Sequence, residues 1–154
     1  MEFKGLLDRT DRQILTELQE NGRISFVALG QRVGLSPPAV TERVRRLEDA
    51  GVITGYRAQV AATKVGLSVL AFIRLQTSRQ QYPALTTTVQ NLSEVLECHH
   101  LAGEDSFLLK VAVSSVDRLE DLLQELSDFG TTNTSIVLSS PLEDGILNLT
   151  SEVK

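Results

Sequence analysis

Two short helical patterns joined by a single glycine turn constrain the first third of this 154-residue chain most strongly. In the stretch "FVALGQRVGLSPPAV", Leu29 and Val33 lie at helical spacing, Gly34 breaks the pattern, and Pro37 suits the first position of a new helix. An earlier helical pattern, "RTDRQILTELQE", precedes this pair. Three helices with a tight glycine turn between the last two predict a helix-turn-helix.

The segment after this motif is predicted to form strands rather than another helix. "VITGYRAQV" (52–60) predicts a strand, a turn and a second strand, which would form a wing. We therefore expect residues 1–60 to form a winged helix-turn-helix domain, followed by a linker over residues 57–67.

The third predicted helix carries the basic run "RVRR" at residues 43–46. Its apolar residues recur at helical spacing, so the opposite face is expected to meet base edges and phosphates in the major groove of DNA. Those outward residues are Pro38, Ala39, Thr41, Glu42, Arg45 and Arg46, and Arg57 in the wing would add a backbone contact. The alternative is a solvated helix face, with the arginines paired to nearby acidic residues.

Charge divides unevenly between the two halves. Residues 1–64 carry a balance of +2 and residues 65–154 a balance of −7, which together give the net charge of −5. Such an asymmetry indicates two modules with different partners.

The second half predicts strand, helix, strand, strand, helix and strand in that order. The strands are "SVLAFIRLQT", "EVLECHHL", "SFLLKVAV" and "NTSIVLS", and the helices are "ALTTTVQNL" and "VDRLEDLLQELSDF". This order predicts a ferredoxin-like βαββαβ domain over residues 61–154, which makes the whole chain an α+β protein. Leu70 and Phe72 leave the first strand apolar on both faces, so a homodimer is expected to cover one of them.

No residues form a recognisable catalytic set, and no cofactor is expected. Cys98, His99 and His100 alternate on a strand, so at most two of them share a face, fewer than a zinc site needs. The turn "HLAGEDSF" offers backbone N–H groups around Gly103 and the carboxylates of Glu104 and Asp105, which could bind a free amino acid, although an ordinary exposed turn has the same composition.

The cellular setting is expected to be the cytoplasm. The N-terminus resembles no signal peptide, no apolar run is long enough to span a membrane, and Cys98 has no partner for an intramolecular disulfide.

Taken together, "LDRTDRQILTELQENGRIS", "LGQRVGLSPPAVTERVRRLEDAGVITGY" and "ECHHLAGEDSFLLKVAV" resemble the Lrp/AsnC family of bacterial and archaeal regulators over Leu7 to about Leu149. The resemblance implies a regulator of transcription that binds double-stranded DNA, responds to amino acids, and assembles as dimers and octamers. By position, it assigns Ser36, Pro38, Thr41, Arg45 and Arg46 to DNA. It assigns the turn and a nearby strand to the effector, through His100, Ala102, Gly103, Glu104, Asp105, Ser106, Thr132 and Thr134.

One position departs from the family pattern. Ser106 stands where the family often has an aspartate, which would abolish or change amino-acid binding. Besides an effector-modulated regulator, the sequence leaves three alternatives open. They are an architectural DNA-binding protein of low sequence specificity, a ligand-insensitive regulator, and a sensor acting through protein partners; an enzyme is a distant fourth.

Overall fold

A computed structural model describes residues 7–104 and 106–149, and its contacts divide the chain into two compact units. The first comprises the residues up to 59 together with those from 142 onward, and the second comprises residues 60–141. The segment after residue 141, which the sequence assigned to the second module, thus makes its contacts with the first unit. The predicted domain boundary itself stays a prediction.

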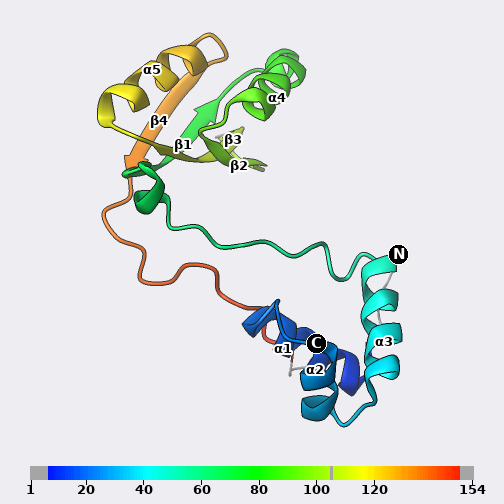
Figure 1. The fold of residues 1–154 in the computed structure, drawn as a ribbon. Coiled ribbons are helices and arrows are strands. Elements are labelled where there is room, and N and C mark those ends of the chain that lie inside the picture. Colours follow the sequence, from blue (N-terminus) through cyan, green and yellow to red (C-terminus); the bar gives the residue numbers. More distant parts are fainter. Residues whose placement is uncertain (1–6, 105, 150–154) are drawn as a thin grey trace. The chain divides into compact units, whose positions relative to one another are not determined.

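The first unit contains three helices: α1 (Arg9–Glu20), α2 (Phe26–Val33) and α3 (Pro37–Asp49) (Figure 1). Helix α2 ends at Gly34, whose φ of 73° is the left-handed conformation that glycine adopts without strain. The predicted stripes meet in one core, formed by Ile14, Leu15, Leu29, Val40, Val44 and Leu47.

Gly30 explains how closely α2 and α3 approach. A Cβ at this position would lie 2.5 Å from the carbonyl oxygen of Leu35 and 3.4 Å from a methyl group of Val40. Any side chain would therefore push the turn and α3 away from α2. Glycine destabilises the interior of a helix, and the close packing of α2 against α3 offsets this loss of stability.

The strand–turn–strand expected over residues 52–60 is not formed, because the sheet of the described chain consists only of β1 to β4. The N–H groups of Val52 and Ile53 both donate to the carbonyl of Leu47, at 2.9 and 3.1 Å, which folds the segment back on the end of α3. An isolated two-stranded hairpin is marginally stable at best, so these local bonds decide the conformation.

The second unit has the predicted order of elements. Its strands are β1 (Val69–Gln76), β2 (Val95–His100), β3 (Phe107–Val113) and β4 (Thr131–Ile136), and its main helices are α4 (Tyr82–Asn91) and α5 (Val116–Ser127). Two short 3-10 turns, η1 (Ala62–Val65) and η2 (Arg79–Gln81), precede β1 and α4. The strand order β2-β3-β1-β4, with antiparallel neighbours, is that of the ferredoxin-like fold.

Alternation along β1 gives the sheet two different faces. Ala71, Ile73 and Leu75 are fully buried in the core with the leucines of α4 and α5, and both helices lie on this side of the sheet (Figure 1). We call the opposite side the outer sheet face. The pairing register gives it four apolar residues on the two central strands: Leu70, Phe72, Leu108 and Ala112. The expected apolar residues on both faces of β1 are therefore present.

Candidate functional site

The exposed side of α3 carries most of the residues predicted to meet DNA. Pro38, Thr41, Glu42 and Arg45 are exposed and Ala39 is half-buried, whereas Val40, Val44 and Leu47 face the core. Ser36 is the N-cap residue of α3 but makes no capping hydrogen bond through its side chain. Pro37 at the first position needs no such partner for its nitrogen, and the N-terminal end of α3 remains accessible.

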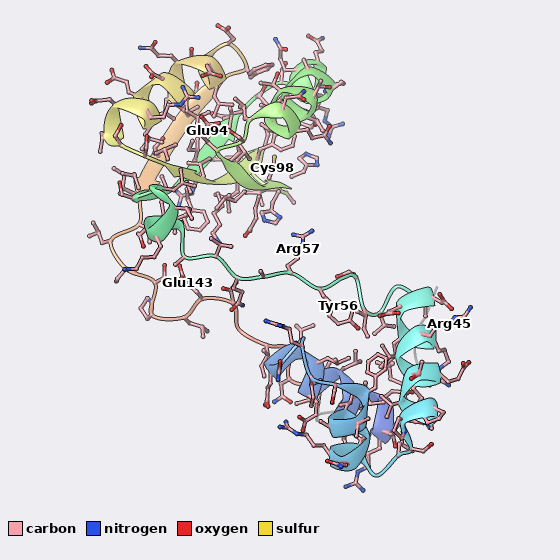
Figure 2. All side chains as sticks on the ribbon, in the orientation of Figure 1. Arg45, Tyr56, Arg57, Glu94, Cys98 and Glu143 are labelled. Carbon is pink, nitrogen blue, oxygen red and sulfur yellow. The ribbon has the colours of Figure 1, made fainter. Side chains whose placement is uncertain are left out.

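Among the three arginines of "RVRR", Arg45 differs from the other two. Its side chain is 75% exposed, and among the described residues its ionic contact is a loose approach of 3.8 Å to Asp49, one turn along α3. In Figure 2 it points away from α1 and α2. An exposed pair of this kind is weak, so the Arg45 guanidinium can leave Asp49 for a phosphate or a guanine.

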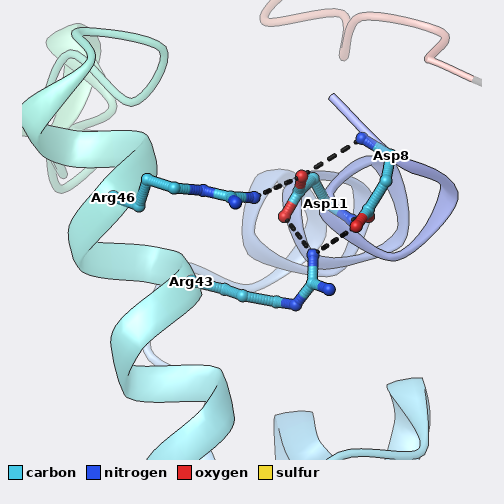
Figure 3. A network of polar contacts seen from close by, with 4 residues as sticks. All are labelled: Asp8, Asp11, Arg43 and Arg46. Carbon is cyan, nitrogen blue, oxygen red and sulfur yellow. Dashed lines mark hydrogen bonds and ion pairs between the residues drawn. The ribbon is translucent and has the colours of Figure 1, made fainter. Parts of the chain in front are cut away.

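Arg43 and Arg46 instead bind a carboxylate of α1 (Figure 3). Asp11 is completely buried; one of its oxygens accepts from Arg43 at 2.8 Å and the other from Arg46 at 2.7 Å. Arg43 also donates to Asp8 at 2.6 Å. We call these four side chains the Asp11 network. Arg46, although 53% exposed, therefore has a partner inside its own domain.

The same aspartates begin α1. Asp8 and Asp11 form a capping box, in which each carboxylate accepts from the backbone N–H of the other at 2.8 and 3.1 Å. The Asp11 N–H and then Arg43 hold the pKa of Asp8 below its usual value, and the bonds to Asp8 and Asp11 raise that of Arg43. The two arginine partners of Asp11 lie 32 and 35 residues away in the sequence, beyond the reach of any local pattern.

Arg57 does not lie on a wing hairpin, because none is formed. It is exposed on the irregular segment that follows Tyr56, whose hydroxyl donates to Glu48 at 3.0 Å near the end of α3. Burial, followed by the interaction with Glu48, raises the pKa of Tyr56 to about 12, so this hydroxyl remains a donor at neutral pH. The bond attaches the start of the linker to α3.

The predicted effector turn joins β2 to β3. Ala102, Gly103 and Glu104 are exposed, Gly103 has a φ of 144°, and Asp105 lies outside the described residues. The ring of His100 stacks on Phe107, with centroids 5.0 Å apart, and meets the edge of Tyr82 from α4 at 4.9 Å. This aromatic cluster fixes one side of the turn.

Ser106 is buried and its hydroxyl already has two partners. It donates to the carbonyl of Thr77 at 3.0 Å and accepts from the Thr77 N–H at 3.3 Å. Its own N–H donates to Leu75 at 3.0 Å. The hydroxyl thus fastens the turn to the end of β1.

Thr132 and Thr134 are half-buried on β4, paired with Leu75 and Ile73 of β1. Since Leu75 pairs on its other side with Phe107, β1 separates Thr132 from the effector turn by two strand spacings, roughly 10 Å. The two predicted groups of effector residues therefore flank the end of β1 without forming one contact set within a single chain.

Cys98 and His100 pair with Leu109 and Phe107, whereas His99 pairs with Leu108 and so lies on the other face. In the described part of the chain, no group of three or more potential ligands could hold a metal ion. Nor does any described helix have the length and apolarity to cross a membrane.

Comparison with known proteins places both units in one class, that of DNA-binding proteins with an attached ligand-binding domain. Residues 7–54 match the family model described as winged helix-turn-helix DNA-binding, and residues 70–147 match the Lrp/AsnC ligand binding domain. The chain belongs to the Lrp/AsnC family of transcriptional regulators, which are not enzymes. The predicted family, α+β fold and regulatory function are confirmed.

Individual relatives agree over nearly their whole length. An uncharacterized HTH-type transcriptional regulator of Bacillus subtilis, YezC, is 44% identical over 87% of this chain and 95% of its own. The leucine-responsive regulatory protein of Escherichia coli is 42% identical over 86% and 85%. Among solved structures, the Neisseria meningitidis regulator NMB0573 in its L-Met complex is 32% identical, with a TM-score of 0.88 over 94% and 97% of the chains.

We expect substitutions in the Asp11 network to lower the free energy of unfolding by different amounts. Asp11→Asn leaves two arginines without their buried carboxylate, so we expect the free energy of unfolding of the first unit to fall by about 2–3 kcal/mol. Arg46→Ala should cost less, about 1 kcal/mol, because Arg43 still neutralises Asp11. Urea unfolding measures both changes. Asp49→Asn is the control, since it removes an exposed carboxylate, and an equal loss for Asp11→Asn and Asp49→Asn would contradict the assignment.

Proposed function

We propose that this regulator binds specific operator sequences through α3 and that an amino acid or related small molecule changes its affinity for them. The exposed N-terminal half of α3 carries this proposal, because it presents Pro38, Ala39, Thr41 and Glu42 while Arg45 remains available for DNA. Ser36 and Arg57 are proposed backbone contacts. Arg46 is proposed to contact a phosphate only through guanidinium nitrogens that Asp11 leaves available.

The effector is proposed to bind at the turn between β2 and β3. Support comes from the L-Met complex of the Neisseria relative and from the exposed backbone of Ala102–Glu104 beside His100. Asp105 would supply a carboxylate for the ammonium group, and Thr132 and Thr134 would contribute from β4 of a neighbouring copy. Ser106 would act by holding the turn in place, since its hydroxyl is bonded to Thr77.

We also propose that the protein acts in the cytoplasm as a homodimer that assembles further. The outer sheet face supports the dimer, because Leu70, Phe72 and Leu108 are apolar there and α4 and α5 lie on the opposite side of the sheet (Figure 1). A second copy laid on this face would bury them, as the two sheets of a β-sandwich do.

Selection of genomic DNA fragments by the purified protein, with and without a panel of amino acids, tests the proposal. We expect an inverted-repeat site whose occupancy changes with one amino acid, because the two DNA-binding units of a dimer read symmetric half-sites. A preferred site that no amino acid affects would favour the ligand-insensitive regulator, which the bonded hydroxyl of Ser106 makes the second candidate. Binding without any preferred sequence would contradict operator recognition.

Arg45→Ala should weaken operator binding and lower the salt dependence. If Arg45 contacts a phosphate, the slope of log K against log salt should fall by about 0.9 for each subunit, and if it contacts guanine, discrimination at one base pair should fall by about 1–3 kcal/mol. Fluorescence anisotropy over a salt series distinguishes the two. Arg79→Ala removes an exposed arginine of the second unit as control, and equal effects of both substitutions would exclude Arg45 as a contact.

Phe72→Glu should weaken dimer formation, because it replaces a large apolar side chain of the outer sheet face with a carboxylate that would lose its water on association. Sedimentation velocity should show monomers at concentrations where the unmodified protein is dimeric. Thr86→Glu, on the exposed side of α4, adds the same charge elsewhere and should leave association unchanged. Unaltered association of Phe72→Glu would place the dimer interface on another surface.

A further inference from the structure

The C-terminal segment of the chain returns to the DNA-binding unit and binds helix α1. The side-chain amide of Gln19 forms two bonds with the backbone of Leu147, accepting from its N–H at 2.7 Å and donating to its carbonyl at 3.2 Å. Seven residues earlier on α1, a guanidinium nitrogen of Arg12 donates to the carbonyl of Leu149 at 3.2 Å. We call residues 142–149 the C-terminal strap.

A groove beside α1 receives the end of the strap. It is a hollow of about 310 Å³ between α1 and the segment after α3, lined by Leu15, Leu18, Val52, Ile53 and Tyr56, with Leu147 and Leu149 of the strap along its wall. Leu149 packs against the helix-turn-helix core. Residues two apart in an extended chain point to the same side, so a Leu-x-Leu sequence suits this groove.

The strap is also the direct continuation of β4. The last sheet bond from that end is donated by Val137 to the carbonyl of Leu70, and Leu147 follows ten residues later. The chain therefore connects the two units twice, once through the linker after Tyr56 and once through the strap. Strand β4, which precedes the strap in the chain, contains Thr132 and Thr134, two of the proposed effector contacts.

The attachment of the strap is shallow. Leu147 is 71% exposed, and both bonds to Gln19 are open to solvent. Hydrogen bonds in such positions compete with water and add little net stability. The strap can therefore detach without unfolding the helix-turn-helix core, which is held by other residues.

We propose that the groove on α1 is a docking surface for this chain's own Leu-x-Leu segment, and that the docked strap restrains the DNA-binding unit as a second tether. The restraint limits the positions that the unit can take, so less freedom is lost when it binds an operator. This effect on DNA binding rests on the operator recognition proposed above, whereas the docking itself does not.

Hydrogen exchange of the full-length protein, measured without DNA, tests the docking. In the unmodified protein we expect the Leu147 amide to exchange more slowly than an exposed amide without a hydrogen bond, and Gln19→Ala should raise its exchange rate by roughly fivefold because the Leu147 N–H loses its acceptor. Gln13→Ala is the matched control, since Gln13 lies exposed on the same helix and, unlike Gln19, is not hydrogen-bonded to Leu147. Fast exchange in the unmodified protein, or no response to Gln19→Ala, would overturn the docking.

Operator affinity of the same variants tests the tether. We expect Gln19→Ala to weaken binding several-fold and Gln13→Ala to leave it unchanged. If Leu147 loses its protection while affinity is unaffected, the strap docks but does not restrain the DNA-binding unit, and the tether is overturned. Absence of operator binding by the unmodified protein would instead refute the proposed function, with the exchange result still standing.

A mixing experiment decides whether the strap stays on its own chain. Gln19→Ala protein retains an intact strap, and a variant lacking residues 142–154 retains Gln19. In a refolded mixture, slow exchange at Leu147 should not return if each strap binds its own α1. Restored protection would show that the strap crosses to a second copy and would overturn the intrachain assignment.

Discussion

The buried carboxylate of Asp11 is the interaction on which the DNA-binding unit depends. A completely buried charge is stable only when paired, and here its partners are Arg43 and Arg46 on α3. Because the two arginines lie almost one turn apart on α3, their bonds to one carboxylate restrict rotation of α3 about its axis. That rotation determines which residues of α3 face solvent rather than the core.

This arrangement gives the basic run "RVRR" two different roles. Val44 packs in the core, Arg43 and Arg46 bind α1, and Arg45 alone projects from the domain without a close partner among the described residues. A cluster of arginines in a sequence can thus attach its helix to a neighbouring helix as well as bind DNA. The exposed fraction of a side chain does not distinguish these roles, because Arg46 is half exposed and still paired.

In the ligand-binding unit, the end of β1 holds the neighbouring segments in place, as Asp11 does in the DNA-binding unit. Thr77 is bonded to Ser106 on one side, and its hydroxyl donates to the carbonyl of Phe129 on the other. Gly130 is required next to it, because a Cβ there would lie 2.1 Å from the carbonyl oxygen of Gln76. The turn between β2 and β3 and the start of β4 are therefore both attached to one short stretch of backbone.

Local sequence determined most of the elements and the composition of both cores. The stripes of α1, α3 and α5, the αL glycine after α2 and the βαββαβ order all follow from periodicity and capping, which act over a few residues. The two strands expected over residues 52–60 are not formed, because bonds from Val52 and Ile53 to Leu47 outweigh a weak strand propensity. Only the tertiary structure decided the partners of Asp11, the bonded state of the Ser106 hydroxyl and the contact of Gln19 with Leu147. Each joins residues between 29 and 128 positions apart, and a periodic pattern carries no information on such pairs.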